Sequence, residues 1–258
     1  HRFGAQDYRI ESEETVFHGF FRVSKQVLRH RLFAGGWSRP VQRELFQRGD
    51  AVGVLLYDPE QHTIGLVEQF RAGAQNDQHG PWQYEVVAGM IDPGMTPEQV
   101  AVKELKEEAG ISVEKLLPIT DYLVSAGGSD EKMHMFCGLC DLQNRGGIFG
   151  AEHEGEDILF QVWPYDQVMQ AQSEGPLNSA ALTIALLTDR ERSTTAGVAI
   201  HLSQDNARQG KSFIKGFGRI DGVLTYHRIY HKECFNGVGR GVNLFDLAHH
   251  FIVDMQST

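Results

Sequence analysis

Three glutamates near the middle of the chain are spaced for chemistry that none of them could perform alone. Glu104, Glu107 and Glu108 stand at positions i, i+3 and i+4, so in a helix all three carboxylates project from one side. Like charges in that array repel one another unless a cation neutralises them. Hard divalent ions such as Mg²⁺ take oxygen ligands and often bridge to phosphates. The spacing therefore indicates a metal site, although a solvated acidic helix face is the commoner explanation for such a cluster.

Start and stop signals flank these glutamates and predict a helix over residues 97–109. Thr96 can cap the first turn, and Gln99 completes a capping box with Thr96. Pro97 suits the first helical position, where a backbone N–H is not needed. Gly110 is placed to end the helix in a left-handed conformation. A bounded helix that follows a glycine turn favours the metal site over the solvated face.

The apolar residues of this helix predict which side packs on a core. Ala101, Leu105 and Ala109 recur at i, i+4 and i+8, which is the spacing of a core-facing stripe. Glu108 borders the stripe, so we expect its side chain to be partly buried and firmly held. Such rigidity is a property that a metal site requires.

Apolar and β-branched runs predict strands on both sides of the helix. Residues 51–57 are almost all apolar, which is typical of a strand buried on both faces. In the first fifty residues, aromatic runs punctuated by glycines favour an antiparallel meander. Strands interleaved with helices indicate an α/β domain over about residues 1–190. The predicted strands are 8–11, 17–23, 26–33, 51–57, 63–70, 84–88, 119–124, 133–139 and 158–162, and a further helix is predicted at 179–187.

Composition argues against several broad classes of protein. The chain has 258 residues, of which 41% are hydrophobic, and this is enough for a packed core. No run approaches the ~18–20 apolar residues of a membrane-spanning helix, and none is typical of a signal peptide. The net charge of -10 argues against nucleic-acid binding, and three cysteines suggest a reducing compartment. We therefore expect a cytoplasmic protein without membrane or nucleic-acid partners, and an N-terminus trimmed before His1.

Two other regions carry weaker signals. Cys137 and Cys140 have the spacing of a metal knuckle, but residues three apart on a strand point to opposite faces. Residues 191–258 are rich in glycine and histidine and show no sustained periodicity. This tail is either an appended small subdomain or a segment that does not fold compactly.

The helix and the turn before it match a known pattern at seven positions: Gly89, Glu104, Leu105, Glu107, Glu108, Gly110 and Ile111. They resemble the Nudix box, Gly-x5-Glu-x7-Arg-Glu-U-x-Glu-Glu-x-Gly-U, in which U is aliphatic. The likeness to the bacterial ADP-ribose pyrophosphatase branch of that family spans about residues 3–188. Further segments that carry it are 18–21, 29–33, 67–71, 85–89 and 154–158.

The resemblance implies a Nudix α/β/α sandwich with a mixed sheet and an N-terminal antiparallel β subdomain. We expect residues 1–50 to form that subdomain, residues 51–190 the Nudix hydrolase domain, and residues 191–258 a tail of unknown fold. The family likeness also implies a homodimer, in which the N-terminal strands are exchanged or packed across the two-fold axis. One subunit would then contribute residues to the adenine pocket of the other.

The implied reaction is Mg²⁺-dependent hydrolysis of ADP-ribose to AMP and ribose 5-phosphate, with Mn²⁺ as another usable ion. The resemblance makes Glu104, Glu108 and the Ala88 carbonyl the metal ligands. Glu107 is expected to bind another ion or to bridge through water, and in that way to take part in catalysis. The metal ligands are already engaged, so a separate carboxylate must activate the attacking water.

The implied catalytic carboxylate lies in an acidic loop that contains Glu154 and Glu156. This loop corresponds to the catalytic loop of the family, and Glu156 is narrowly favoured over Glu154; a solvated acidic loop is the alternative. Glu85 is expected to support the metal site by contacting its ligands and not the metal itself. An anionic substrate also needs cations and stacking surfaces. The candidate substrate contacts are Arg71 and, more weakly, Arg43 and Arg48 for phosphate, Phe17 or Phe20 for adenine, and Ser125, Gly128 and Glu131 in a Gly-rich loop for the terminal ribose.

Three departures from the family pattern leave alternatives open. Met95 replaces the first glutamate of the box, Lys103 replaces its arginine, and Ala126 replaces a proline that marks the ADP-ribose branch. An ammonium is a point donor and is not equivalent to a forked guanidinium, so we expect slower catalysis. Ala126 favours another nucleotide sugar, such as GDP-mannose, as substrate. Met95 and Lys103 favour a sensor that binds ADP-ribose without turnover.

Overall fold

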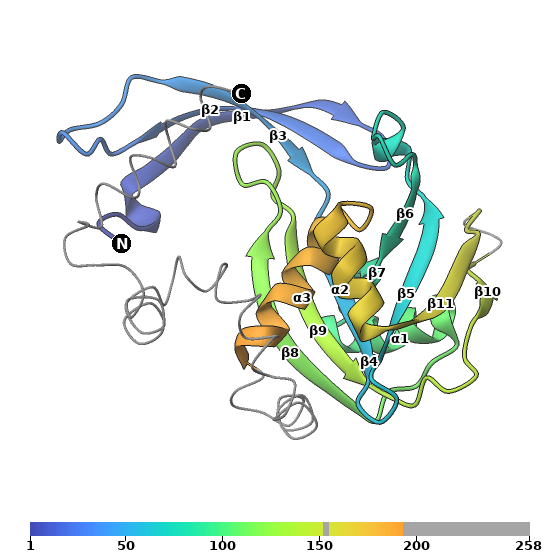
Figure 1. Ribbon diagram of the computed structural model, residues 1–258. Helices are drawn as coiled ribbons and strands as arrows, with labels where there is room; N and C mark the ends of the chain where they lie inside the picture. Colours follow the sequence, from blue (N-terminus) through green and yellow to red (C-terminus); the bar gives the residue numbers. More distant parts are fainter. Residues whose placement is uncertain (152–154, 193–258) are drawn as a thin grey trace, which may run out of the picture. The chain divides into compact units, whose positions relative to one another are not determined.

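The computed structural model describes residues 1–151 and 155–192, which belong to one compact unit of the chain (Figure 1). Within them lie two β-sheets, three α-helices and two short 3-10 turns at Ala5–Asp7 and Ala72–Ala74. Almost all of the tail at 191–258 is outside the described residues, as is Glu154. No helix of the described part is long and apolar enough to cross a membrane.

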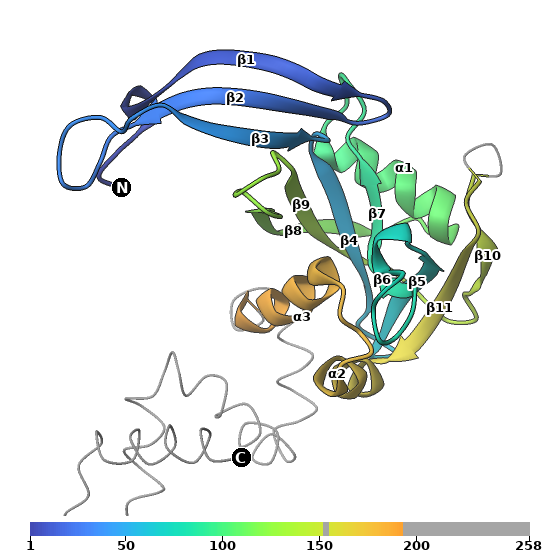
Figure 2. The same ribbon diagram turned by 90° about the horizontal axis from the view of Figure 1, so that it is seen from above.

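The N-terminal sheet has three antiparallel strands in the order β1-β2-β3, so the expected meander is confirmed (Figure 2). The prediction of one strand over residues 17–23 is wrong, because the chain reverses there. The Gly19 N–H donates to the Phe21 carbonyl at 2.9 Å within that turn. In this sheet, sequence patterns missed β3, whose three consecutive polar residues hide the alternation. The strands are β1 (Tyr8–His18), β2 (Arg22–His30) and β3 (Val41–Gln47).

The second sheet is mixed, because β4 and β9 run parallel and the other pairs run antiparallel. Its order is β10-β11-β5-β4-β9-β8, with β6 paired to β5 and β7 paired to β4. The predicted single strand at 84–88 is wrong, since the chain changes partner at Val86. The strands are β4 (Ala51–Asp58), β5 (Thr63–Phe70), β6 (Trp82–Glu85), β7 (Val87–Met90), β8 (Lys115–Leu123), β9 (Lys132–Leu139), β10 (Gly147–Phe149) and β11 (Ile158–Pro164).

Helices cover both faces of this mixed sheet, which confirms the expected α/β/α sandwich (Figure 2). Helix α1 (Pro97–Ala109) packs on one face, and α2 (Tyr165–Glu174) and α3 (Ala180–Arg192) pack on the other. Every residue of β4 is buried, as its apolar run predicts. Cys137 belongs to the core cluster of α2 and α3, whereas Cys140 belongs to that of α1. The opposite orientation expected for the two cysteines is confirmed.

Helix α1 begins and ends where the sequence indicates. The Thr96 hydroxyl accepts a hydrogen bond from the Gln99 N–H at 3.3 Å, and the Gln99 side chain accepts the Thr96 N–H at 2.9 Å. Gly110 ends the helix in the left-handed region, with φ 62°. The buried residues of α1 contain the whole predicted stripe and the glutamate beside it: Val100, Ala101, Leu105, Glu108 and Ala109.

Removal of this cap should weaken the protein measurably. Thr96→Ala is expected to lower the free energy of unfolding by about 1 kcal/mol, because the Gln99 N–H loses its acceptor. Urea unfolding followed by circular dichroism measures the loss. Thr96→Ser keeps the hydroxyl and should stay close to the wild type, so equal losses in both variants would contradict the role of the cap.

Candidate active site

The carboxylate of Glu108 is the most deeply buried of the predicted site groups. Glu108 is 3% exposed, and its Oε2 accepts a hydrogen bond from the Ala88 N–H at 3.1 Å. Burial raises the pKa of Glu108 to about 8, against the opposing effect of the Ala88 hydrogen bond. The charges of Glu104 and Glu156 raise this pKa further and the charge of Arg71 lowers it. Four of the predicted site residues, Glu108 included, are thus close enough to interact electrostatically.

Glu104 lies directly over the backbone of Gly89, on the strand next to Ala88. A Cβ on Gly89 would overlap the carboxylate of Glu104 and the carbon chain that carries it. Position 89 therefore requires glycine, because any larger side chain would prevent α1 from packing this closely on β7. The Glu104 side chain is 13% exposed. The helix thus places Glu104 and Glu108 against neighbouring residues of a single strand.

A methyl group at this contact should disturb the site without unfolding the protein. In Gly89→Ala, the Cβ is expected to displace the Glu104 carboxylate. The value of kcat/KM for ADP-ribose, the substrate that the resemblance implies, should fall by about 10²-fold. The matched control is Gly73→Ala, since a Cβ there meets no atom within 4 Å. Steady-state kinetics on both variants, with circular dichroism to confirm folding, measure the effect. Full activity in Gly89→Ala would show that the position of Glu104 is unimportant.

Lys103 stands at the arginine position of the Nudix box and faces three carboxylates. Its Nζ lies 3.3 Å from Asp92 Oδ2 and 3.8 Å from both Glu104 Oε1 and Glu107 Oε2. The hydrogen bond to Asp92, helped by the charges of Glu104 and Glu107, raises the pKa of Lys103. Met95, in place of the first glutamate of the box, packs against the core cluster of α1. An aspartate that sequence patterns did not identify therefore anchors the lysine.

Arg71 is held at the edge of the site by Glu85. The Arg71 Nε donates to Glu85 Oε2 at 2.6 Å, between the end of β5 and the end of β6. The side chains of Arg71 and Glu85 are 43% and 20% exposed. This pair depends on the pairing of β5 with β6, which no spacing in the sequence discloses. Glu85 was expected to support the metal site, and the contact that it makes is with the guanidinium.

Glu156 lies between β10 and β11, and the start of this connection is hydrogen-bonded to α1. The Glu156 Oε2 accepts a hydrogen bond from the Ala151 N–H at 3.0 Å. The Gly150 N–H donates to the Glu107 carbonyl at 3.3 Å. These contacts bring Glu156 to the C-terminal half of the helix that carries the glutamates, in agreement with its effect on Glu108.

The other predicted substrate residues are carried by different elements. Arg43 is exposed on β3, and Phe17 is 58% exposed near the end of β1, so both belong to the N-terminal sheet. The candidates for the terminal ribose, Ser125, Gly128 and Glu131, share the loop between β8 and β9. The Ser125 carbonyl accepts the Gly128 N–H at 3.0 Å, whereas the Glu131 side chain is buried.

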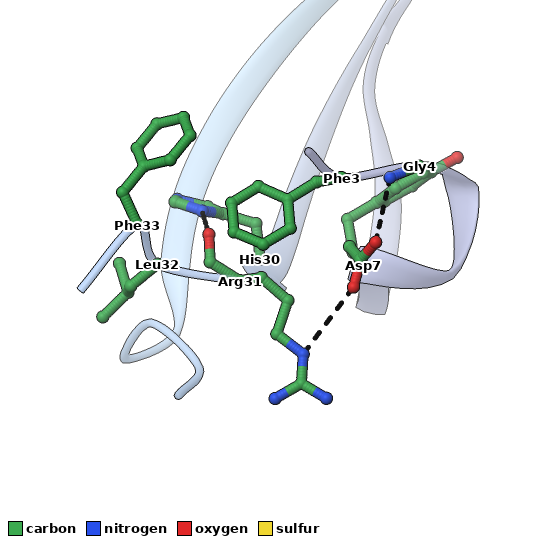
Figure 3. A pocket seen from close by; sticks show the side chains of 8 residues that line it. Phe3, Gly4, Asp7, His30, Arg31, Leu32 and Phe33 are labelled. Atoms are coloured by element: carbon green, nitrogen blue, oxygen red, sulfur yellow. Dashed lines mark hydrogen bonds and ion pairs between the residues drawn. The ribbon is translucent and has the colours of Figure 1, made fainter. Parts of the chain in front are cut away.

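A hollow of about 350 Å³ lies at one end of the N-terminal sheet (Figure 3). Phe3, Leu32 and Phe33 contribute its apolar walls, and Arg31 Nε lies 3.8 Å from Asp7 Oδ1 at its edge. None of the predicted site residues lines it. The acidic group around Glu108 is therefore a separate feature of the fold.

The oxygen donors around Glu108 suit a hard cation that keeps part of its water shell. Within residues 1–151 and 155–192, no three Asp, Glu, His or Cys side chains converge closely enough to enclose an ion by themselves. Glu104 and Glu108 nevertheless offer two carboxylates beside the backbone of Ala88. Mg²⁺ commonly uses one or two carboxylates, and waters and substrate phosphates complete its octahedron. The chemistry of the donor set fits such an ion.

The raised pKa of Glu108 predicts how the stability of the metal-free protein changes with pH. Unfolding returns the carboxyl to its ordinary pKa of 4.5, so from that value up to about 8 the folded chain holds a proton that the unfolded chain has lost. The free energy of unfolding should therefore fall as the pH rises through this window. Urea unfolding in EDTA at about pH 5 and about pH 8 tests this, and Glu108→Gln should reduce the difference. A variant with the wild-type pH dependence would contradict the assignment.

Comparison with known proteins relates this arrangement to one family. The family model described as NUDIX domain matches residues 47–182. The ADP-ribose pyrophosphatase of Escherichia coli strain K12 is 40% identical over 184 residues, which are 71% of this chain and 88% of that protein. The ADP-ribose pyrophosphatase of Haemophilus influenzae is 40% identical over 187 residues, which are 71% of this chain and 86% of that protein.

More distant similarities extend the comparison. The GDP-mannose pyrophosphatase of Klebsiella pneumoniae is 29% identical over 167 residues, which cover 64% of this chain and 77% of that protein. A crystal structure of an ADP compounds hydrolase has the same fold, with a TM-score of 0.56 and 21% identity. That similarity covers 76% of this chain and 99% of the solved one.

Proposed function

Since this chain belongs to the Nudix hydrolase family, we propose that it cleaves the pyrophosphate of ADP-ribose to AMP and ribose 5-phosphate. One observation carries the proposal: Glu104 and Glu108 are held against the Ala88–Gly89 backbone, beside Arg71, in a chain 40% identical to ADP-ribose pyrophosphatases. Hydrolysis adds one water across a phosphorus–oxygen bond, so the products account for every atom of the reactants.

We assign the metal ligands to Glu104, Glu108 and the Ala88 carbonyl, with Mg²⁺ as the natural ion and Mn²⁺ as a substitute. When bound, the cation would polarise phosphate oxygens and stabilise charge on the leaving phosphate. Glu104 and Glu108 supply the negative charge that offsets the ion. Glu107, whose side chain is 46% exposed, is proposed to contact a further ion or a bridging water.

Glu156 is the proposed general base. It takes a proton from the attacking water while the water oxygen bonds to phosphorus, and the bridging oxygen leaves with its electron pair. The hydrogen bond from the Ala151 N–H fixes one oxygen of this carboxylate and orients the other. Glu154 in the same loop is the alternative.

The remaining groups are proposed to bind the two ends of the substrate. Arg71 contacts phosphate through its terminal nitrogens, because Glu85 engages its Nε. Arg43 supplies a second cation, and Phe17 stacks on adenine. The loop that contains Ser125, Gly128 and Glu131 encloses the terminal ribose.

A homodimer formed through residues 1–50 would place the N-terminal aromatics beside a neighbouring site. Support comes from β1, whose eleven residues are all exposed. Large apolar side chains on it, among them Tyr8 and Ile10, are 54% and 46% exposed. An edge strand with such a surface favours association. Phe17 of one subunit would then reach the adenine pocket of the other.

Incubation of the purified protein with Mg²⁺ and either ADP-ribose or GDP-mannose tests the function. We expect AMP from ADP-ribose as the dominant product. A preference for GDP-mannose would favour the second candidate, which Ala126 and the 29% identical GDP-mannose pyrophosphatase support. Tight binding of ADP-ribose without release of AMP over hours would instead indicate a sensor.

A further inference from the structure

The loop between β8 and β9 is joined to the free edge of the N-terminal sheet through backbone hydrogen bonds. The Phe46 N–H donates to the Gly128 carbonyl at 2.8 Å, and the Asp130 N–H donates to the Phe46 carbonyl at 3.2 Å. Phe46 and Ser129 form a parallel β-bridge. β3 is an edge strand of its sheet, so these bonds satisfy backbone groups that would otherwise face solvent. The second half of the loop is therefore fixed, whereas Ser125 remains exposed.

Arg48, two residues after Phe46, contacts both acids at the end of this loop. Its backbone N–H donates to Asp130 Oδ1 at 3.1 Å, and its Nε lies 3.3 Å from Glu131 Oε1. The Glu131 side chain is 8% exposed, and burial raises its pKa while the charge of Arg48 lowers it. The buried Arg48 Nε has no aligned hydrogen bond among the described residues, so attraction between opposite charges dominates this contact.

The same guanidinium also contacts the aromatic turn between β1 and β2. Its central carbon lies 5.3 Å from the ring centroid of Phe21, which is within range of a cation–π interaction. The Phe21 ring packs edge-on against Phe46 at 5.1 Å and against Phe20 at 4.8 Å. Arg48 thus contacts both a turn of the N-terminal sheet and a loop of the mixed sheet.

We propose that Arg48 is a positioning residue that holds the Ser125–Glu131 loop in the shape required to bind the ribose end of the substrate. This inference rests on the proposed function, because that function places the terminal ribose in the loop. Arg48 acts through Asp130 and Glu131 and need not touch the substrate. Without the guanidinium, the buried carboxylate of Glu131 loses the opposite charge beside it, which favours a displaced loop in which water reaches this carboxylate.

The experiment compares Arg48→Met, Arg48→Lys and the matched surface control Arg145→Met in the full chain. In Arg48→Met, backbone amides of residues 125–131 are expected to exchange with deuterium about tenfold faster in the free protein. KM for ADP-ribose should rise by about tenfold, while kcat stays within about threefold of wild type. Arg48→Lys retains the charge near Glu131, so its loop exchange rate and its KM should both return most of the way to the wild-type values. Arg145→Met should behave as wild type.

The two measurements separate the failure of this inference from the failure of the proposed function. Wild-type loop exchange in Arg48→Met would overturn the inference, whatever the enzyme hydrolyses. A fall in kcat at unchanged KM would also overturn it, since it would indicate an effect on the reacting groups. Faster loop exchange in a protein that releases no AMP from ADP-ribose would sustain the role of Arg48 in holding the loop and refute both the substrate and the link to ribose binding.

Discussion

Glu108→Gln is expected to lower kcat for ADP-ribose hydrolysis by on the order of 10³-fold. Glutamine has nearly the same shape, and its side-chain carbonyl can still accept the Ala88 N–H. What disappears is the negative charge that this carboxylate would present to a bound cation, at a residue that is 3% exposed, where solvent screens the charge little. The substitution thus removes charge while it leaves packing in place. Steady-state AMP release at increasing Mg²⁺ concentration measures the effect.

A matched control lies on the same helix. Glu98 is exposed in the first turn of α1, so Glu98→Gln changes the charge of the protein equally and should retain wild-type kcat. If the carboxylate is a ligand, Glu108→Gln should need a higher Mg²⁺ concentration for half-maximal activity, because a weaker site fills only at a higher metal concentration. A Glu108→Gln enzyme that keeps kcat within about threefold of wild type would rule out a metal-binding role for this carboxylate.

Glu156→Gln is expected to lower kcat by about 10²–10⁴-fold with little change in KM or in metal affinity. The amide retains a partner for the Ala151 N–H but cannot accept a proton from water. Steady-state AMP release at saturating ADP-ribose and Mg²⁺ measures the loss of kcat.

Two other variants decide whether Glu156 is the right carboxylate. Glu114→Gln alters an exposed acid just after α1 and should leave kcat unchanged. Glu154→Gln should lower kcat much less than Glu156→Gln does. If the larger loss of kcat belongs to Glu154→Gln, the general base is Glu154 and the assignment to Glu156 is wrong.

Local signals in the sequence are sufficient to predict α1, the helix that carries Glu104, Glu107 and Glu108. The cap at Thr96, the stop at Gly110 and the stripe that ends at Ala109 are properties of consecutive residues, and the structure confirms all three. The burial of Glu108 follows from its place beside that stripe. The buried strand β4 could likewise be predicted, since an all-apolar run needs cover on both faces. The α/β/α sandwich around it was implied by the resemblance to the Nudix family.

Contacts between distant segments could not be predicted, because they depend on strand register and loop paths. The pairs Arg71–Glu85 and Lys103–Asp92 are of this kind, and so is the bridge between Phe46 and Ser129. Strand β3 was missed for a related reason: its polar residues become a strand only by pairing with β2. Helix α2 was missed because only Tyr165 and Val168 of its ten residues are buried, which leaves a faint apolar stripe.

A crystal of the protein soaked with Mg²⁺ and a non-hydrolysable ADP-ribose analogue tests the central claim most directly. We expect an ion bonded to the carboxylates of Glu104 and Glu108, with the analogue's pyrophosphate between that ion and Arg71. A pyrophosphate bound elsewhere, or an ion that touches neither glutamate, would contradict the proposed site.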